Sequence, residues 1–439
     1  MEKVKEQIAG SQNPHESDPL PTPNQQPNHD RNHSSRRNWL IFLCAVIGSG
    51  WFLWPRCSHH QMLRTPVTLE DRVHNILTST PLIDGHDDFP IFIREFYHNH
   101  IYDSNFTESF IHGNLSGHVD LPRLKKGYVG GTFWSVFVCA KPSNKSMLCH
   151  ACKGLTPRFS RGPPNGTTAL QAFRQGKIIS PLGIEGLQSI GNSLAHLRMF
   201  YDLGVSYATL THNCHNKYAD AALVELADDG IKKADPIWHG VSSAGQDLVY
   251  EMNRLGMIID LAHVSVQTMR DVLGAGKTEW TGSRAPVIFS HSSAYALCPH
   301  PRNVPDDVLA LVQQTNSIVM VNFAPEFISC SASDNENGLP DTDYEHATLA
   351  LVADHIMHIG AVAGFDHVGI GSDFDGIPKT PKGLEDVSKF PDLIAELLRR
   401  GVSDEDAGKV AGGNLLRVWR EVDQVALEMQ ARGDYPAED

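Results

Sequence analysis

Histidine and aspartate occur together at the end of an apolar run, residues 81–90, which reads Pro-Leu-Ile-Asp-Gly-His-Asp-Asp-Phe-Pro. Alternate residues of a strand share a face, so we expect His86 and Asp88 to point the same way and Asp87 to point the other way. Imidazole nitrogen and carboxylate oxygen are common metal ligands. Taken alone the pattern is weak, because a solvated loop or a hydrogen-bonded core histidine explains it more often.

The same arrangement recurs along the chain. Seven further segments are rich in valine, isoleucine and aromatic residues or contain glycine, which is typical of buried strands, and five of them carry at or near their end a residue that could do chemistry. The segments are 129–138, 181–186, 207–212, 257–263, 286–291, 318–323 and 367–373. The residues that could do chemistry are Glu185, His212, His263, His291 and Asp373.

Helix-like segments alternate with the strand-like ones. Apolar residues recur three and four positions apart in 192–203, 243–255, 266–273, 305–314, 348–359 and 391–400. This alternation predicts parallel pairing, and eight strands predict an α/β fold, a closed (β/α)8 TIM-like barrel of the metal-dependent hydrolase type. The active site of such a barrel lies at the C-terminal ends of the strands, where the polar residues fall. A doubly wound open sheet is the alternative, but these residues are spread too evenly to meet in one crevice.

The ligand types indicate which chemistry this rim could do. Three or more histidines together with carboxylates suit Zn²⁺, and a glutamate can bridge two ions. Two ions roughly 3.5 to 4 Å apart can share a hydroxide and polarise the carbonyl group that it attacks. The residues therefore predict hydrolysis, with zinc as the suited metal.

In combination, the motifs resemble those of the membrane dipeptidase (renal dipeptidase) family of zinc peptidases. The resemblance runs over residues 68–425. It is carried by Ile-Asp-Gly-His-Asp-Asp at 83–88, Gly-Ile-Glu-Gly at 183–186, Leu-Thr-His-Asn-Cys at 210–214, Ile-Asp-Leu-Ala-His-Val-Ser at 259–265, Phe-Ser-His-Ser-Ser-Ala-Tyr at 289–295, Arg-Asn-Val-Pro-Asp-Asp at 302–307, Gly-Ser-Asp-Phe-Asp-Gly at 371–376 and Gly-Leu-Glu-Asp-Val-Ser-Lys-Phe-Pro-Asp-Leu at 383–393.

The resemblance implies two zinc ions per chain and a metal role for five of the matching residues. One zinc ion would be bound by His86 and Asp88, and the other by His263 and His291. Glu185 would bridge the two ions. The family thus assigns a ligand to every position that the strand-end pattern singled out, except His212 and Asp373.

Three further residues would act on a dipeptide substrate. The resemblance implies that His212 faces the substrate and donates a hydrogen bond to the developing oxyanion. Arg302 would hold the free C-terminal carboxylate, for which a planar guanidinium is well shaped. Asp373 would carry a proton from the bridging hydroxide to the leaving amine. Without the resemblance, a core histidine, a solvated loop charge and a turn-capping aspartate are ordinary interpretations of the same residues.

The predicted function is therefore zinc-dependent hydrolysis of dipeptides. One alternative keeps the barrel and both metals but acts on another small amide or a lactam, and the carboxylate clamp at Arg302 discriminates between the two. A second alternative is a non-catalytic cell-surface glycoprotein, in which a metal ligand or His212 would be replaced. A nucleic-acid partner is disfavoured by the net charge of −14. A homodimer is one option that the sequence leaves open.

The N-terminal part of the chain predicts a membrane anchor. Residues 1–37 hold almost no large apolar side chain and predict a disordered cytoplasmic tail. Residues 38–54 are uncharged, contain tryptophan near both ends and predict one transmembrane signal anchor, followed by a linker at 55–67. More arginine precedes the span than follows it, which places the catalytic domain in the lumen or outside the cell. A cleaved signal peptide is the alternative.

Glycosylation sequons fit this topology. Asn105, Asn114, Asn144 and Asn165 each begin an Asn-x-Ser/Thr sequon beyond the span, in loop-like sequence. The cysteines fit it as well, because most of the eight lie in the body of the chain. The family resemblance pairs Cys139 with Cys214 and Cys298 with Cys330.

One segment departs from the family pattern. Residues 141–164 are basic, are interrupted by proline and glycine, and lack an apolar stripe with helical spacing. We expect the outer helix after the second strand to be missing or replaced by a loop, either as an unusual loop or as an erroneously translated segment. Cys149 and Cys152 lie here, as a local disulfide or two free thiols. The chain is expected to end in a polar tail, residues 426–439.

Overall fold

The computed structural model describes residues 67–137, 165–228, 230–276 and 279–439. The chain divides into two units, Met1–Thr65 and Pro66–Asp439, and all of the described residues belong to the second. Among the described residues, no helix is long and apolar enough to span a bilayer. The predicted tail at 1–37 and anchor at 38–54 lie outside the described residues, as does the linker up to residue 66, and these remain predictions.

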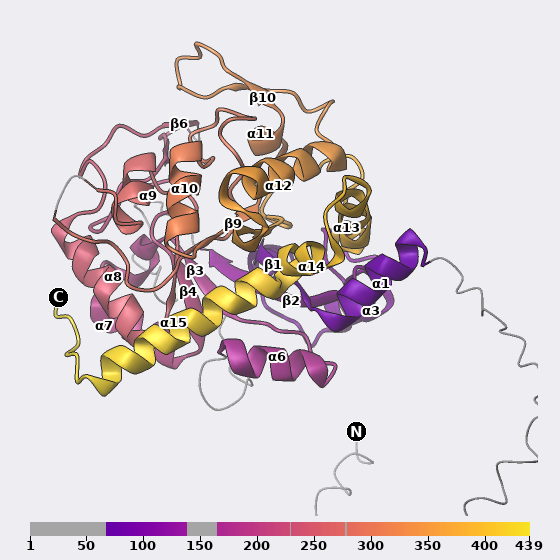
Figure 1. The fold of residues 1–439 in the computed structure, drawn as a ribbon, viewed down its shortest axis with the longest axis horizontal. Helices are drawn as coiled ribbons and strands as arrows, with labels where there is room; N and C mark the ends of the chain where they lie inside the picture. Colours follow the sequence, from indigo (N-terminus) through magenta and orange to yellow (C-terminus); the bar gives the residue numbers. More distant parts are fainter. Residues whose placement is uncertain (1–66, 138–164, 229, 277–278) are drawn as a thin grey trace, which may run out of the picture. The chain divides into compact units, whose positions relative to one another are not determined.

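Eight parallel strands form the central sheet (Figure 1). In sheet order they are β1 (Leu82–Asp87), β2 (Val129–Phe137), β3 (Leu182–Glu185), β4 (Val205–Thr209), β7 (Ile258–Asp260), β8 (Ile288–Phe289), β9 (Ile318–Val321) and β12 (Val368–Ile370). The first and last strands meet just beyond β12, where the Asp88 N–H donates to the Phe374 carbonyl at 2.8 Å and the Asp373 N–H to the His86 carbonyl at 3.0 Å. The predicted barrel of eight parallel strands is therefore confirmed, as a nearly closed one.

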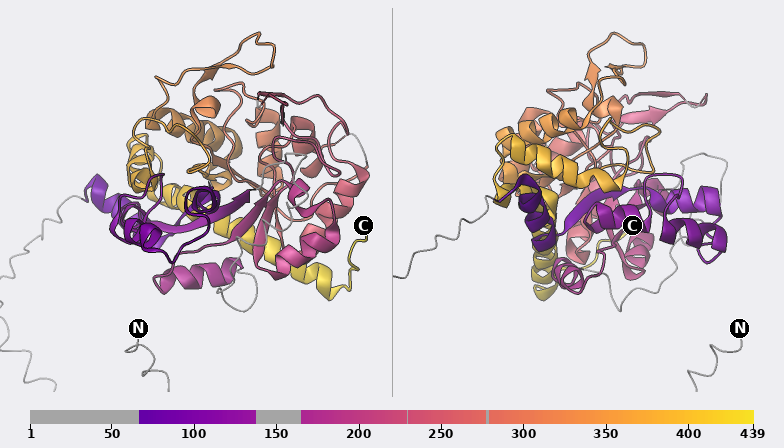
Figure 2. Two further views of the ribbon diagram at one scale, coloured as in Figure 1. Left: turned by 180° about the vertical axis from the view of Figure 1, so that it is seen from behind. Right: turned by 90° about the vertical axis from the view of Figure 1, so that its right-hand side faces the viewer.

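Helices surround the barrel in the order that the alternating pattern predicts (Figures 1 and 2). The six helices expected from the sequence are α7 (Leu194–Asp202), α8 (Ser243–Leu255), α9 (Val266–Val272), α10 (Asp306–Gln314), α12 (Leu349–Ala363) and α13 (Phe390–Arg399). Three of them begin at a capping side chain, because Ser242, Ser265 and Thr348 each accept the N–H of the third residue that follows. All six predictions are confirmed.

The sequence pattern did not identify the remaining helices. They are α1 (Leu69–Ser79), α2 (Phe89–Tyr97), α3 (Ser104–His112), α4 (Leu121–Lys126), α6 (Gly166–Arg174), α11 (Pro325–Ile328), α14 (Asp404–Gly408) and α15 (Asn414–Ala431). Two small antiparallel sheets lie in long connections: β5 (Leu223–Glu225) with β6 (Ile231–Lys233), and β10 (Cys330–Ser331) with β11 (Asp341–Thr342).

The interior of the barrel is filled by apolar side chains and covered at one end by α15. Phe133 and Tyr207 from neighbouring strands lie with ring centroids 5.1 Å apart, and Trp419 of α15 meets Phe133 at 5.3 Å. All three side chains are at most 1% exposed. The strands are buried on both faces, as parallel strands in a barrel are. α15 therefore closes this end of the barrel in the described part of the chain.

The connection between β2 and β3 contains the helix α6, which begins after the atypical segment, so the expectation that residues 141–164 form no helix stays a prediction. α6 begins at Asn165, whose side chain accepts the N–H groups of Thr167 and Thr168 at 3.1 and 2.8 Å. Its Ala169 is buried, and Phe173 packs against the same core cluster as the strand residues. The atypical residues 141–164, with Cys149 and Cys152, lie outside the described residues.

The C-terminal stretch is more ordered than a polar tail. α15 continues past residue 425 to Ala431, with Ala426 and Met429 buried. At the chain end, Asp439 accepts the N–H of Leu194 at 2.7 Å, so it caps the first turn of α7. The folded unit therefore extends through the residues expected to form the tail.

Predictions on cysteines and sequons have different outcomes. The Cys298–Cys330 disulfide is present, with Cα atoms 5.0 Å apart. Cys214 has no disulfide partner among the described residues, and its predicted partner Cys139 lies outside them, so that pairing stays a prediction. Asn105 lies exposed within α3 rather than in a loop, and Asn114 lies exposed after it. Asn165 caps α6, and Asn144 lies outside the described residues.

Candidate metal centre

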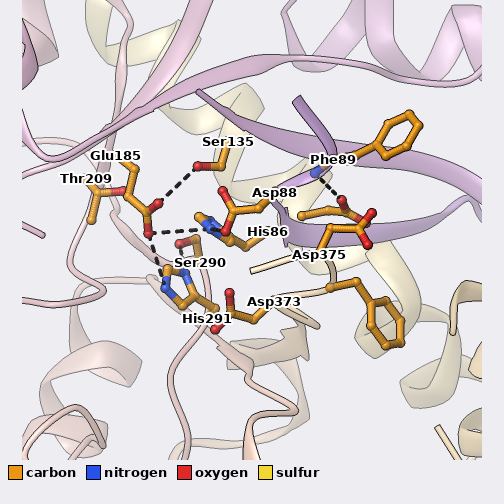
Figure 3. A network of polar contacts seen from close by, with 12 residues as sticks. His86, Asp88, Phe89, Ser135, Glu185, Thr209, Ser290, His291, Asp373 and Asp375 are labelled. Atoms are coloured by element: carbon orange, nitrogen blue, oxygen red, sulfur yellow. Dashed lines mark hydrogen bonds and ion pairs between the residues drawn. The ribbon is translucent and has the colours of Figure 1, made fainter. Parts of the chain in front are cut away.

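The predicted ligands come together at the C-terminal ends of the strands. His86 is on β1, Glu185 is the last residue of β3, and His263 and His291 follow β7 and β8. Asp88 begins α2 as its N-cap residue. All five side chains are buried, with at most 6% of the residue exposed. Figure 3 shows His86, Asp88, Glu185 and His291 directed toward one another.

Glu185 lies at the centre of this cluster. Its Oε1 atom is 3.5 Å from His86 Nε2, 3.1 Å from His263 Nε2 and 3.6 Å from His291 Nε2. The ligand atoms form two close sets that share Glu185: one with His86 and Asp88, and one with His263 and His291. Asp373 forms a third set with His86 and His291. The first two sets match the two metal sites that the sequence predicted.

Hydrogen bonds fix how two of the imidazoles present their nitrogens. Asn213 Oδ1 lies 3.1 Å from His263 Nδ1, and an amide oxygen can only accept, so His263 carries a proton there. Ser290 Oγ lies 2.8 Å from His291 Nδ1, and its own proton goes to Asp260 Oδ2 at 2.6 Å, so His291 also donates from Nδ1. Both residues therefore direct an unprotonated Nε2 into the cluster, which is the form that binds a metal.

These nitrogens face each other without a proton between them. His263 Nε2 and His291 Nε2 are 3.0 Å apart, although each carries its proton on Nδ1. Both ring nitrogens of His86 and Oδ1 of Asp88 are buried without a hydrogen-bond partner. Buried polar atoms without partners are rare and require an explanation such as an ion. A cation held by these residues would supply the missing partner, so the residues fit a metal centre.

Burial and mutual charge shift the pKa values of the same groups. Burial raises the pKa of Glu185 to about 8 and that of Asp373 to about 6. Burial alone would lower the pKa of His86, but the negative charges of Glu185 and Asp88 outweigh it and raise that pKa to about 10. Burial, followed by nearby positive charge, lowers the pKa of His263 and of His291. When no cation is bound, the neutral imidazoles of His263 and His291 therefore lie beside Glu185 and His86, whose raised pKa values keep them protonated at neutral pH.

Two site residues adopt backbone conformations that side chains other than glycine rarely take. His263 has φ 65° and Asp373 has φ 66°, both in the left-handed region. Each such residue costs of order 1 to 3 kcal/mol and persists only where the surrounding structure holds it. Each of the two residues lies three positions beyond the end of its strand, β7 or β12, where the chain turns sharply.

His212 lies beside the metal ligands and contributes no ligand atom to the three sets. Its ring centroid is 4.3 Å from that of His263 and 4.5 Å from that of Phe137. Its Nδ1 faces Glu225 Oε1 on β5 at 3.9 Å. Burial, followed by the positive charge of Arg302, lowers the pKa of His212 to about 3. It is therefore a neutral imidazole able to donate one hydrogen bond.

Arg302 is a buried guanidinium with donors to spare. It is 3% exposed, its Nη2 donates to the His291 carbonyl at 3.4 Å, and its Nε is buried without a partner. The guanidinium carbon lies 4.9 Å from the ring centroid of Phe327. Burial lowers the pKa of Arg302 to about 10, so it stays charged at neutral pH. A buried cation of this kind suits a carboxylate ligand.

A cavity of 530 Å³ opens above these residues. Its polar lining includes Asp88, Glu185, His212, His263, Arg302 and Asp373. Its apolar lining includes Ile91, Phe137, Leu223, Ile231, Leu339 and Ile377. All eight residues predicted to bind metal or substrate are thus found around one space of the size of a small-molecule site, because His86 and His291 lie directly beneath it.

Sequence reasoning missed the residues that hold the ligands in place. Ser135 donates to Glu185 Oε2 at 3.1 Å, and Asn322 donates to Asp373 Oδ2 at 2.9 Å. Asn213 and Ser290 orient His263 and His291, as described above. A usable signal existed for these last two, because each stands beside a histidine in a motif already singled out. Ser135 carried no such signal.

Comparison with known proteins gives consistent matches. Residues 70–433 match the family model described as membrane dipeptidase (peptidase family M19). Dipeptidase aclJ of Aspergillus oryzae is 44% identical over 425 residues, which cover 93% of this chain and 93% of that protein.

Solved structures share the fold. Dipeptidase AC, a metallopeptidase of family M19, is 26% identical with a TM-score of 0.61, over 78% of this chain and 98% of that chain. The probable dipeptidase PvdM from Pseudomonas aeruginosa is 22% identical with a TM-score of 0.67, over 82% of this chain and all of that chain. A metallopeptidase from Rhodobacter sphaeroides, solved with a phosphinate mimic of the dipeptide L-Ala-D-Ala, is 24% identical with a TM-score of 0.61, over 78% of this chain and 99% of that chain.

Proposed function

Because the chain belongs to the membrane dipeptidase family, peptidase family M19, and is a metallo-dipeptidase, we propose that it hydrolyses dipeptides with two zinc ions in its metal centre. One observation carries the proposal most strongly, namely that two sets of ligand atoms share Glu185. Nitrogen and carboxylate ligands suit zinc, and a shared carboxylate suits a pair of ions. Zinc, which the sequence also predicts, is therefore the proposed metal.

Five residues would hold the ions. His86 and Asp88 would bind one, His263 and His291 the other, and Glu185 would bridge them. When bound, a zinc pair supplies a hydroxide nucleophile at neutral pH and polarises the carbonyl group under attack. The hydrogen bonds from Ser135, Asn213 and Ser290 keep the ligands oriented, so little reorganisation is needed on binding.

Arg302 would fix the substrate by its C-terminal carboxylate. Its unpartnered Nε and its position beside the cavity support this role. A buried guanidinium can bind a carboxylate through two parallel hydrogen bonds, which sets the orientation as well as the affinity. A substrate that lacks a free carboxylate would leave this charge buried and unpaired. The clamp therefore favours dipeptides over other small amides.

His212 and Asp373 would act on the peptide bond itself. His212 is neutral and lies against His263, so its N–H can donate to the carbonyl oxygen as negative charge develops there. One carboxylate oxygen of Asp373 accepts a hydrogen bond from Asn322. An oxygen of Asp373 also lies within 4.8 Å of a ring nitrogen of His86 and of His291. Its carboxylate would take the proton of the attacking hydroxide and deliver it to the leaving amine.

Metal content and hydrolysis, measured together, test the proposal. The full chain is purified, its zinc per chain is determined by atomic spectroscopy, and hydrolysis of Ala-Ala is followed by release of free amino acid. We expect about two zinc ions per chain, and activity that chelation abolishes and added zinc restores. Glu185→Gln keeps the shape of the side chain but removes the bridging charge, so it should lose both zinc and activity.

Glu251→Gln is the matched control. Glu251 is fully buried, but it pairs with Arg198 and Arg254 at 2.8 and 2.7 Å, and none of the three lines the cavity. This variant should lose stability and keep its zinc. A Glu185→Gln enzyme that retains two zinc ions and full activity would contradict the proposed centre. Hydrolysis of small amides without a free carboxylate, at the rate of dipeptides, would contradict the clamp at Arg302.

Localisation is proposed from the sequence. We infer that residues 38–54 anchor the protein in a membrane with the N-terminus in the cytoplasm and the catalytic domain in the lumen or outside the cell. The sequons support this, since Asn105 and Asn114 lie exposed on the folded unit. Glycosidase treatment should increase the gel mobility of the expressed protein, and the Asn105→Gln and Asn114→Gln variants should each lose part of that shift.

A further inference from the structure

Two chain segments far apart in the sequence meet beside the cavity. One is the pair of strands β5 and β6, and the other is the loop from Cys330 to Thr342, which contains β10 and β11. The Lys233 N–H donates to the Asn337 carbonyl at 2.8 Å, and Asn337 Nδ2 donates to the Ile231 carbonyl at 3.4 Å. The right-hand view of Figure 2 shows both segments projecting from the same end of the barrel. We call them together the arch.

The arch is fixed internally as well as at its base. The disulfide from Cys330 to Cys298 ties the loop to the segment that carries Arg302. Within the loop, Asn335 Nδ2 donates to the Leu339 carbonyl at 3.0 Å and to Asp341 Oδ1 at 2.9 Å. On the other side, the Ala222 N–H, just before β5, donates to the His263 carbonyl at 2.7 Å. The arch is therefore preformed.

The sheet order shows which part of the site the arch spans. β5 and β6 follow β4, and the loop follows β9, while β7 and β8 lie between these two strands in the sheet. The connections after β7 and β8 carry His263 and Arg302. The arch therefore runs past the sector in which Arg302 would hold the C-terminal carboxylate, on the side of the metal centre away from β1 and β12.

Apolar side chains of the arch line the cavity in that sector. Leu223, Ile231 and Leu339 all contribute to the lining, and Ile231 is still 39% exposed. Glu326 lines the same wall and is held by the Tyr344 hydroxyl at 2.7 Å. Covering an exposed apolar side chain with an apolar ligand group lowers the free energy of the complex. A fixed carboxylate repels a negatively charged ligand group.

We propose that the arch is the specificity wall for the side chain of the substrate's C-terminal residue, selecting apolar over small and over acidic side chains. The inference rests on the proposed function, because it takes Arg302 as the anchor of the C-terminal carboxylate. With that carboxylate fixed, the adjacent side chain reaches the wall formed by Ile231 and Leu339. The side chain of the N-terminal residue lies on the far side of the metal centre, toward Ile91 and Ile377.

The test compares two series of dipeptides on the zinc-loaded full chain. In the first, the N-terminal residue is alanine and the C-terminal residue is glycine, leucine or aspartate; in the second, the order is reversed. The wild type should prefer Ala-Leu over Ala-Gly and disfavour Ala-Asp. Leu339→Ala should lower the ratio of kcat/KM for Ala-Leu to that for Ala-Gly roughly tenfold, the lower end of the effect of one methylene group in an apolar pocket, because Leu339 forms only part of the wall. The ratio for Leu-Ala to Gly-Ala should not change.

Matched controls separate the wall from general damage. Leu427→Ala makes the same change on α15, where the residue is 62% exposed. Gly338→Ala and Gly176→Ala both place a methyl group at a left-handed residue, with φ +70° and +73°. Only the methyl group at position 338 would contact β6, with Lys233 Cβ at 3.1 Å, whereas the one at position 176 would contact nothing within 4 Å. The Leu427 and Gly176 variants should keep the wild-type ratios, and the Gly338 variant should lose C-terminal selectivity.

The outcomes distinguish this inference from the function on which it rests. An unchanged Ala-Leu to Ala-Gly ratio in Leu339→Ala, or a loss that appears in the N-terminal series, overturns the arch as the C-terminal wall while leaving the dipeptidase intact. A wild-type enzyme that prefers Ala-Asp does the same. A zinc-loaded wild type that cleaves no dipeptide in either series overturns the proposed function, and the inference falls with it.

Discussion

Replacing Ser290 by alanine should weaken metal binding without touching a metal ligand. Ser290 Oγ donates to Asp260 Oδ2 at 2.6 Å and accepts from His291 Nδ1 at 2.8 Å. It therefore holds His291 in the tautomer that presents an unprotonated Nε2 to the cluster. Ser290→Ala removes this partner, so the proton of His291 can move to either nitrogen and the ring can rotate.

The expected magnitude follows from these contacts. Loss of a residue that orients a metal ligand typically weakens metal affinity by about 10- to 100-fold. The Asp260 carboxylate keeps its other hydrogen-bond donors, which are the hydroxyl of Thr209 at 2.5 Å and the N–H groups of Ala262 and Ser290 at 3.0 and 2.8 Å. Both of its oxygens therefore remain hydrogen-bonded. The metal-free protein should therefore lose only about 1 to 3 kcal/mol of unfolding free energy, the usual cost of one lost hydrogen bond to a buried charged group.

Competition with a chelator of known zinc affinity measures the first quantity, and urea unfolding of the metal-free protein measures the second. Ser317→Ala is the matched control. Ser317 is fully buried and its Oγ accepts the Val287 N–H at 3.0 Å, just before β8 and β9 at the other end of the barrel. This variant should lose stability and keep the wild-type zinc affinity.

Two results would refute the reasoning. Wild-type zinc affinity in Ser290→Ala would mean that His291 needs no orienting partner. An equal loss of zinc affinity in Ser317→Ala would mean that affinity follows overall stability rather than the orientation of one ring.

Three further predictions concern the clamp, the protons and the disulfide. Arg302→Lys should lower kcat/KM for Ala-Ala roughly 100-fold through KM, because an ammonium group cannot supply two parallel hydrogen bonds; an unchanged KM would contradict the clamp. Zinc uptake at pH 7 should release protons, because Glu185, with a pKa of about 8, and His86, with a pKa of about 10, are protonated in the metal-free protein. Zinc affinity should accordingly rise as the pH rises from about 6 to about 8. Calorimetry in buffers of different ionisation enthalpy measures both the affinity and the protons released. An affinity that does not depend on pH would contradict these pKa shifts. Replacing Cys298 and Cys330 by serine should lower the unfolding free energy by about 3 to 4 kcal/mol in urea titrations, since the disulfide closes a loop with a sequence separation of 32 residues; a loss below about 1 kcal/mol would show that the loop is held by its other contacts.

The strand-end pattern predicted the site because of a general property of parallel barrels. All eight strands point the same way, so side chains at their C-terminal ends meet on one rim whatever their separation in sequence. Glu185 ends β3, and His291 follows β8 by two residues. Short buried strands of valine and isoleucine between amphipathic helices were also readable, which is why the order of strands and six of the helices followed from the sequence.

Asp88 lies in the cluster of predicted ligands, but not for the reason that the sequence pattern suggested. The expectation was that His86 and Asp88 share a strand face, but β1 ends at Asp87 and its register is interrupted between Asp84 and Asp87. Asp88 begins α2 with φ −92° and ψ 18°, and the hydrogen bond of its N–H to Phe374 fixes its direction. A contact with the segment just after β12, more than two hundred residues later, thus helps to decide where this carboxylate points, and no local sequence period contains that information.

The backbone at His263 and Asp373 shows the same limit. Residues other than glycine are uncommon in the left-handed region even where the type is tolerated, as histidine and aspartate are, so the sequence did not single out these two positions. Helix α6 was missed although its sequence did carry a local signal. Its capping residue Asn165 was assigned only to a sequon, although an Asn followed three residues later by Thr168 also forms a capping box.

The contacts within the metal centre explain why its ligands depend on so many other residues. Without a cation, two unprotonated nitrogens 3.0 Å apart and a buried carboxylate that touches three imidazoles repel or compete for protons. Side chains free to rotate would separate. They stay together because Ser135, Asn213 and Ser290 hold them from behind and because the strands beneath are fixed by an apolar core. Cations reverse the sign of these interactions, so we expect metal binding to stabilise the fold in addition to enabling hydrolysis. Variants that loosen the supporting residues should therefore lose metal before they lose structure.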